Sequence, residues 1–204
     1  AVNTGGGSSR ENDRTLSWTW NNIISYDKKI GDHHFNILAG QEAYSYRYDE
    51  LTASRSKMAI PDYPELVVGS QVTGGSGYRI DYSLVGYLMN AQYDYKDRYY
   101  LSGSYRRDGS SRFAPETRWG NFWSVGGSWR INREAFMQGT ENWLSALTLK
   151  ASYGAQGNDN LGSYYASSGL YTIISNNNES GLVTDRLATP NLKWETNLNF
   201  NVGI

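Results

Sequence analysis

Hydrophobic and polar residues alternate with a period of two through much of the chain, whereas helical periodicity is scarce. The clearest run covers residues 83–95, where Val85, Tyr87 and Met89 fall on one side of an extended chain and Asn90 falls on the other. Successive side chains of a strand point to opposite faces of its sheet. The pattern therefore predicts a strand with one apolar face and one polar face.

About seven such strands are predicted along the chain. They cover residues 14–25, 34–48, 83–95, 99–106, 119–131, 147–156 and 195–204. The connections alternate roughly between short and long: Lys96-Asp97 is a minimal turn, residues 50–82 are a long stretch rich in Gly, Pro and Ser, and residues 157–192 are a long stretch rich in Asn, Ser and Gly. The moderately long connection at 132–146 is the exception. The connection at 108–118 is intermediate, and Asp108-Gly109 within it predicts a tight turn in which the glycine adopts a positive φ.

The lengths of these strands and connections are typical of a membrane barrel. About ten residues at roughly 3.3 Å each, tilted by roughly 40°, cover about 25 Å along the membrane normal, which is the height of a barrel's apolar band. Up-and-down barrels also join their strands by short periplasmic turns and long extracellular loops. The fold class predicted is all-β, a transmembrane antiparallel up-and-down β-barrel fragment built as a curved meander sheet.

In such a barrel the apolar and aromatic positions face lipid, and the polar positions face a wet lumen. Tyr93, Tyr95 and Tyr99 flank the short Lys96-Asp97 turn, where an aromatic girdle at the periplasmic interface is expected. The alternative is that these tyrosines pack in the core of a soluble sheet.

Composition supports strands and excludes several functions. The 204 residues include 17 Tyr, 7 Trp and 22 Gly, and aromatic residues suit a pleated surface. The net charge of -1, with no cluster of Lys and Arg, disfavours nucleic-acid binding. The sequence has no cysteine, so it has neither a disulfide framework nor a thiolate metal site. It contains no apolar run long enough for a transmembrane helix, and its mean hydropathy of -0.62 suits a barrel with polar loops and lumen.

Several motifs, taken together and in order, resemble one family. They are Asp32–Gln41 (DHHFNILAGQ), Asp94–Leu101 (DYKDRYYL), Arg106–Phe113 (RRDGSSRF), Arg118–Gly120 (RWG), Ser128–Ile131 (SWRI), Leu149–Gly154 (LKASYG), Gln156–Asn158 (QGN) and Pro190–Glu195 (PNLKWE). This set resembles the barrel of SusC/RagA-type TonB-linked (TonB-dependent) outer-membrane receptors. The resemblance is strongest from about Tyr82 onward.

The resemblance implies a barrel of about 22 strands in the cell outer membrane of a Gram-negative bacterium, with a plug at its N-terminus. Such a receptor imports a bulky nutrient, often an oligosaccharide, with energy from the TonB complex, and a SusD-like surface lipoprotein usually caps it. The chain begins at Ala1 and ends within an expected strand. Residues 1–204 are therefore expected to be an internal part of one barrel domain, with the plug and the terminal strand absent.

Candidate chemical groups are few. His33 and His34 are neighbours on a strand and point to opposite faces, so a surface role near a turn is favoured over a shared metal ion. Asp108 and Glu116 could suggest the carboxylate pair of a glycosidase. Four arginines surround them, so salt bridges that order the loop are favoured over an acid and base with raised pKa values. These arginines are Arg106, Arg107, Arg112 and Arg118.

Two further motifs are weak. Asn158-Asp159-Asn160 resembles the start of a calcium loop but lacks the spacing and the final glutamate, so a polar loop is favoured. Gly5-Gly6-Gly7 does not follow a strand and open a helix, as a phosphate-binding loop would. The sequence therefore predicts no catalytic, cofactor or metal site, and a protein that is not an enzyme.

Tyrosines in the two long connections are the candidate ligand contacts, because aromatic faces stack on sugar rings. They are Tyr63, Tyr78, Tyr164, Tyr165 and Tyr171. The alternative is that these rings pack the loops together.

Two other functions compete with transport. A soluble β-sandwich could bind carbohydrate through the same aromatics, but its core would require dense Leu, Ile and Val and shorter strands. A β-rich glycosidase lacks a convincing acid and base pair. The sequence therefore favours a transporter, in contact with outer-membrane lipid and with a glycan or another nutrient.

Overall fold

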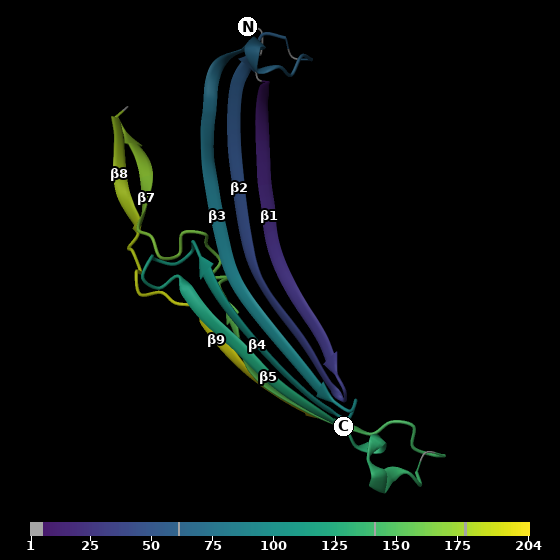
Figure 1. The fold of residues 1–204 in the computed structure, drawn as a ribbon. Helices are drawn as coiled ribbons and strands as arrows, with labels where there is room; N and C mark the ends of the chain where they lie inside the picture. The colour runs from purple at the N-terminus through teal and green to yellow at the C-terminus, as the bar shows by residue number, and fades with distance from the viewer. Residues whose placement is uncertain (1–5, 61, 141, 178) are drawn as a thin grey trace. The chain divides into compact units, whose positions relative to one another are not determined.

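A computed structural model of the protein describes residues 6–60, 62–140, 142–177 and 179–204. Strands dominate these residues (Figure 1). They are β1 (Gly7–Ile30), β2 (His33–Met58), β3 (Gly69–Tyr95), β4 (Tyr99–Ser110), β5 (Trp119–Arg130), β6 (Thr148–Asn158), β7 (Leu170–Asn176), β8 (Glu179–Arg186) and β9 (Glu195–Gly203). Three short 3₁₀ helices, η1 (Leu66–Val68), η2 (Ile131–Arg133) and η3 (Ala135–Met137), lie in the connections. Within the described residues, no helix is long and apolar enough to cross a membrane.

Seven of the strands form one sheet in the order β1-β2-β3-β4-β5-β6-β9, and β7 and β8 form a separate hairpin. The ladders from β3 to β9 are antiparallel, and each strand pairs with its neighbour in sequence except where the β7–β8 hairpin is inserted between β6 and β9. This order leaves β1 and β9 at the two edges of the sheet. The prediction of an antiparallel meander sheet is confirmed.

The chain divides into two compact units. Unit 1 comprises residues up to 18 together with 45–82, and unit 2 comprises 19–44 together with 83–204. In unit 1, the connection between β2 and β3 is closed by a hydrogen bond from the Ala59 backbone N–H to the Val68 carbonyl, 3.0 Å long. Met58 is buried there, close to Gly69.

Several predicted boundaries are wrong. The long connection expected at 50–82 is only ten residues, 59–68, because β2 and β3 continue far beyond their apolar segments. The stretch 69–77 is rich in Ser and Gly and has no apolar face, yet it forms a strand by backbone pairing alone. The connection expected at 157–192 likewise contains the β7–β8 hairpin. The described chain therefore has more strands than the seven or so that periodicity predicted.

The turn predicted at Asp108-Gly109 is also wrong. Both residues lie in β4, where Asp108 pairs with Gly86 on one side and with Gly120 on the other. Gly109 does not adopt a positive φ; instead it makes room for the Trp119 ring, which a Cβ at this position would meet at 3.0 Å. The chain turns only after Ser110.

The minimal turn at Lys96-Asp97 is confirmed. Both residues have positive φ, 55° and 52°, as the two central residues of a type I′ hairpin turn require. Gly31, with φ of 58°, serves the turn between β1 and β2. In unit 2 the Lys96 backbone N–H donates a 2.8 Å hydrogen bond to the Asp32 carbonyl, so that these two turns lie side by side.

Few side chains of the described chain are buried, because both faces of the main sheet are largely uncovered. A small aromatic cluster in unit 2 is one exception: Phe113 and Phe122 are 2% and 7% exposed, and Trp194 packs on both with ring centroids 5.4 and 5.1 Å apart. The Trp194 indole also donates a 2.8 Å hydrogen bond to the Arg118 carbonyl. This cluster fixes the loops onto the ends of β5 and β6.

Candidate functional site

The two faces of the unit 2 sheet differ sharply in polarity. Residues paired directly across strands point to the same face. One set of rows across β3, β4, β5, β6 and β9 is almost entirely apolar. These rows are Met89–Tyr105–Trp123–Ala155–Leu198, Ala91–Gly103–Val125–Tyr153–Phe200 and Tyr93–Leu101–Gly127–Ala151–Val202. We call them the apolar face.

The apolar face is exposed over a wide area. Leu101 is 60% exposed, Val125 53% and Phe200 69%. A soluble domain rarely leaves contiguous apolar surface uncovered on this scale. The arrangement fits lipid-facing strands, and it argues against the predicted alternative in which these residues form the core of a β-sandwich.

Aromatic rings line both ends of the apolar face. Near the Lys96-Asp97 turn, Tyr99 stacks on Tyr95 and on Trp129, with centroids 6.4 Å apart in each case. We call this set the lower rim. At the opposite end Tyr87 stacks on Trp119, with centroids 6.2 Å apart, and these two rings form the upper rim. Amphipathic rings at two levels are typical of the interfaces on either side of a bilayer.

The opposite face of the same sheet carries amides, hydroxyls, glycines and two charged side chains, Asp94 and Lys150. Its rows are Asn90–Ser104–Ser124–Gly154–Asn199, Gln92–Ser102–Gly126–Ser152–Asn201 and Asp94–Tyr100–Ser128–Lys150–Gly203. We call them the polar face. A hollow of about 700 Å³ lies over it, lined among others by His34, Gln92, Lys150 and Asn201. Such a surface can hydrogen-bond water or a polar solute.

An ion-pair network lies at the end of the polar face. The Arg106 Nε donates to both carboxylate oxygens of Asp108 at 2.7 Å, and another guanidinium nitrogen lies 3.2 Å from Glu42. Gly86 lies beneath this pair, and a Cβ there would collide with both side chains. Glu116 lies in the connection that follows β4. Asp108 forms the predicted salt bridge with arginine, but it does so within β4 rather than in a loop.

The two histidines face opposite sides of β2. The His33 ring lies 2.8 Å from the Tyr93 hydroxyl and packs against Tyr95. The His34 ring places its two nitrogens 2.8 and 2.9 Å from carboxylate oxygens of Asp94 and Asp27, and so joins β1, β2 and β3. The predicted opposite orientation is confirmed. The carboxylate partners were missed because they come from other strands and share no local motif with His34.

The Asn158-Asp159-Asn160 segment forms a polar loop tied to its surroundings. Asp159 accepts a 2.7 Å hydrogen bond from the Ser110 hydroxyl through its carboxylate and a 2.8 Å bond from Arg112 through its backbone carbonyl. Arg112 also donates to the Asn160 side-chain oxygen at 3.1 Å. These contacts order the loop between β6 and β7.

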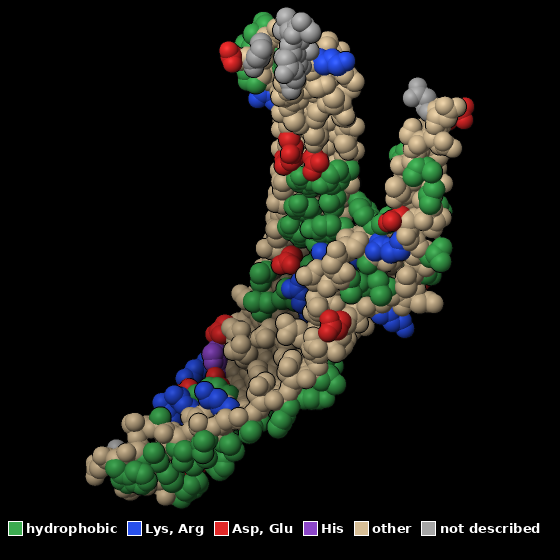
Figure 2. Space-filling model, turned by 180° about the vertical axis from the view of Figure 1, so that it is seen from behind, with side chains coloured by type: hydrophobic (Ala, Val, Ile, Leu, Met, Phe, Trp, Pro, Cys, Tyr) green, Lys and Arg blue, Asp and Glu red, His purple; other side chains and the backbone are tan. Residues whose placement is uncertain are grey.

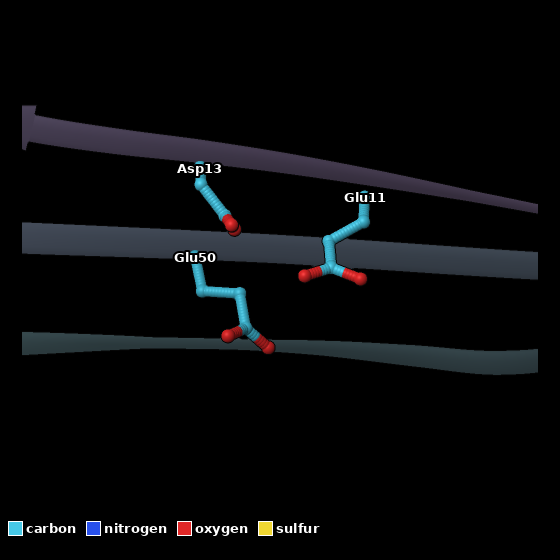
Figure 3. A group of neighbouring side chains, drawn as sticks. All are labelled: Glu11, Asp13 and Glu50. Carbon is cyan, nitrogen blue, oxygen red and sulfur yellow. The ribbon is translucent and has the colours of Figure 1, made fainter.

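Unit 1 holds an acidic cluster that the sequence did not indicate. Carboxylate oxygens of Glu11, Asp13 and Glu50 lie within 4.8 Å of one another (Figure 3). Carboxylates so arranged could coordinate a hard cation such as Ca²⁺, although exposed acidic groups are also common without one. The cluster was missed because β1 and β2 bring together residues almost forty positions apart.

Two tyrosines lie beside this cluster. The Tyr48 hydroxyl donates a 3.0 Å hydrogen bond to Glu50, and the Tyr78 ring lies 5.8 Å from that of Tyr48. Loss of hydration, followed by hydrogen bonding to Glu50, raises the pKa of Tyr48 above its usual value. Hydrogen bonding to Glu50 is the main cause that raises the pKa of Tyr78. Both phenols therefore remain neutral donors. Figure 2 shows acidic and hydrophobic side chains together on one face of this unit.

The tyrosines predicted as ligand contacts fall in different environments. Tyr63 lies in the connection between β2 and β3, and Tyr78 lies on β3, not in a loop as predicted. Tyr164 and Tyr165 lie between β6 and β7, where Arg112 sits 4.9 Å from the centroid of the Tyr164 ring. Tyr171 lies on β7 and is 66% exposed. The first two belong to unit 1 and the last three to unit 2.

Comparisons with known proteins agree with this geometry. The sequence matches the family "TonB dependent receptor-like, beta-barrel" over residues 1–204. It is 27% identical to TonB-dependent receptor P3 of Formosa agariphila, over 98% of this chain and 20% of that protein. It is 28% identical to TonB-dependent receptor SusC of Bacteroides thetaiotaomicron, over 91% of this chain and 19% of that protein.

Solved structures give the same result. The chain superposes on the RagAB peptide transporter with a TM-score of 0.89 and 29% identity, covering 95% of this chain and 22% of that one. It superposes on the RagAB peptide importer in its open-open state with a TM-score of 0.85, covering 96% and 22%. The chain thus spans about a fifth of the length of these relatives.

The match over all 204 residues confirms the predicted resemblance to this family. It also accounts for an open sheet with one apolar and one polar face, because a section of a barrel wall has these properties. The chain belongs to the TonB-dependent receptor-like β-barrel family, whose members lie in the outer membrane, and within it resembles SusC and RagA.

Proposed function

We propose that the chain forms part of the wall of an outer-membrane transporter that takes up a bulky nutrient with energy from the TonB complex. The observation that carries the proposal is the contrast between the apolar face, bounded by its two aromatic rims, and the polar face behind it. Lipid requires the first surface, and a water-filled lumen requires the second.

Fractionation of the full-length receptor tests this proposal. It should sediment with the outer membrane and migrate faster on gels before heating than after, as folded barrels do. Recovery in the soluble fraction would contradict the proposal and favour a soluble carbohydrate-binding domain.

The substrate class proposed is an oligosaccharide. Amides and hydroxyls of the polar face can hydrogen-bond sugar hydroxyls, and the exposed rings of Tyr63, Tyr78, Tyr165 and Tyr171 can stack on sugar rings, together with the half-buried ring of Tyr164. A peptide is the second candidate, because the solved structures with the same fold are of a peptide transporter. The peptide backbone would use the same amides and hydroxyls.

Binding measurements on the full-length receptor separate these candidates. An oligosaccharide mixture and a peptide mixture are titrated in parallel, and only the first should bind if the proposal holds. Tyr78→Ala should then weaken binding about three- to tenfold, whereas Tyr78→Phe, which keeps the ring, should bind normally. Binding of peptides alone would exclude the oligosaccharide.

We also propose that a SusD-like surface lipoprotein contacts the β7–β8 hairpin. An isolated two-stranded hairpin is marginally stable in water unless something packs on it. This hairpin pairs Ile173 with Leu182, and each is 72% exposed, so one of its faces is apolar and uncovered in the described chain. Leu187, which follows β8, is 78% exposed.

Co-purification tests the partner proposal. Ile173→Asp in the full-length receptor should reduce recovery of the proposed SusD-like lipoprotein. Val67→Asp, at an equally exposed site in the connection between β2 and β3, is the matched control and should not. Unchanged recovery with Ile173→Asp would refute the assignment of this surface.

A further inference from the structure

The connection between β5 and β6, described at residues 131–140 and 142–147, combines polar side chains that line a hollow with exposed aromatic side chains. It contains η2 and η3, and it begins directly beneath the lower rim. The hollow has a volume of about 470 Å³ and is lined mainly by polar residues, among them Arg98, Arg133, Glu134 and Gln138, and also by Leu144. All of these residues belong to unit 2.

Two aromatic side chains of this connection are largely exposed. Phe136 is 68% exposed and Trp143 is 74% exposed. Phe136 meets the Trp129 ring edge-on, with centroids 6.5 Å apart and ring planes at 70°. Because Trp129 belongs to the lower rim, the aromatic surface of the sheet continues into the connection. Figure 2 shows hydrophobic side chains gathered over this end of unit 2.

Glu134 fixes the connection against the rim. Its carboxylate accepts a 2.5 Å hydrogen bond from the Tyr99 hydroxyl and a 2.9 Å bond from the Trp129 indole, and Arg98 lies 3.4 Å away. The Tyr99 hydrogen bond and then the Trp129 hydrogen bond lower the pKa of Glu134. The carboxylate is thus ionised at neutral pH. Its hydrogen bonds to Tyr99 and Trp129 anchor the connection to the lower rim two residues before Phe136.

From this geometry we infer that the connection is a membrane-docking element, in which Phe136 and Trp143 insert into the headgroup region of the periplasmic leaflet of the outer membrane. The inference rests on the proposed function, because it requires the apolar face to lie in lipid. Phospholipid is the occupant because the exposed rings extend the lower rim, and aromatic rings prefer the boundary between headgroups and acyl chains. The charged side chains of the connection stay on the wet side.

Spin labels on the full-length receptor in phospholipid vesicles test the inference. The chain contains no cysteine, so Trp143→Cys introduces one attachment site within it. The label should collide with oxygen, which concentrates in lipid, more often than with a water-soluble nickel chelate. Phe136→Cys is a second site that should give the same result if the first variant folds poorly.

Two control positions make the outcome decisive. A label at Met89→Cys, on the apolar face, reports whether the sheet lies in lipid at all, and a label at Val67→Cys, 79% exposed in unit 1, reports an aqueous site. If Met89→Cys is lipid-exposed but the labels at 136 and 143 behave like Val67→Cys, the docking inference fails and the proposed function stands. Water exposure at Met89→Cys would instead refute the proposed function. Protection of the connection from both reagents would indicate a protein partner and overturn the inference.

Discussion

Arginine substitutions at different depths of the apolar face give a graded prediction. Val125 lies four residues from Trp129 of the lower rim and six from Trp119 of the upper rim. At roughly 3.3 Å per residue and a tilt of roughly 40°, these separations correspond to about 10 and 15 Å along the membrane normal. Val125 is therefore close to the middle of the bilayer.

Met89 is shallower, because it lies two residues from Tyr87 of the upper rim, or roughly 5 Å along the normal. An arginine costs roughly 2–4 kcal/mol at the midplane of a barrel and about 0–1 near the interfaces. We therefore expect Val125→Arg to lower the free energy of unfolding by about 3 kcal/mol and Met89→Arg by about 1–2 kcal/mol. Asn90→Arg, on the polar face next to Met89, should cost less than about 1 kcal/mol.

The assay is denaturant titration of the full-length receptor in phospholipid vesicles, followed by tryptophan fluorescence. The test is the order of the losses in unfolding free energy: largest for Val125→Arg, smaller for Met89→Arg and smallest for Asn90→Arg. Equal losses at Met89 and Asn90, or a smaller loss at Val125 than at Met89, would refute the assignment of faces and depth.

Three other predictions concern single contacts. The pKa of Glu134 is lowered in the folded state, so its stabilising hydrogen bonds are fully present above its ordinary pKa of about 4.3 and are lost as pH falls through the folded value. A spin label in the same connection should therefore become mobile only in acid, and Glu134→Gln should abolish this dependence on pH. Gly157→Ala should cost about 1–3 kcal/mol in the denaturant titration, because the new Cβ collides with the buried Phe122 ring, whereas Gly203→Ala meets nothing and should be neutral. Gly86→Ala should cost less, about 1 kcal/mol, because the new Cβ meets only the carboxylate and guanidinium ends of Asp108 and Arg106, which can move aside. An unchanged titration curve would show that the ion pair does not pack on this glycine.

The strands that cross the apolar band could be predicted because a bilayer requires one face of each strand to be apolar. The expected strands at 83–95, 119–131, 147–156 and 195–204 agree with the structure within a few residues where the apolar band lies. Alternation identifies such strands because one face must be apolar. The Lys96-Asp97 turn could be predicted as well, since it separates two runs of alternating apolar and polar residues.

Alternation of apolar and polar residues does not identify the parts of the strands that extend beyond the apolar band. Residues 50–58 and 69–77 form strands without a continuous apolar face, so their sequence has the composition of a loop. The long-range contacts were also out of reach: the Glu11, Asp13 and Glu50 cluster depends on strand register, which single-sequence periodicity does not give. The salt-bridged role of Asp108 could be predicted, because nearby arginines indicated it, but its place in a strand could not.

The central claim is that one face of this sheet contacts hydrocarbon and the other contacts water. The most direct measurement is an accessibility scan of single spin labels from position 121 to 128 of β5 in the full-length receptor in vesicles. The account predicts that oxygen accessibility alternates with a period of two, high at 123, 125 and 127 and low at the positions between them. Uniform water accessibility along the strand, or alternation in the opposite phase, would contradict it.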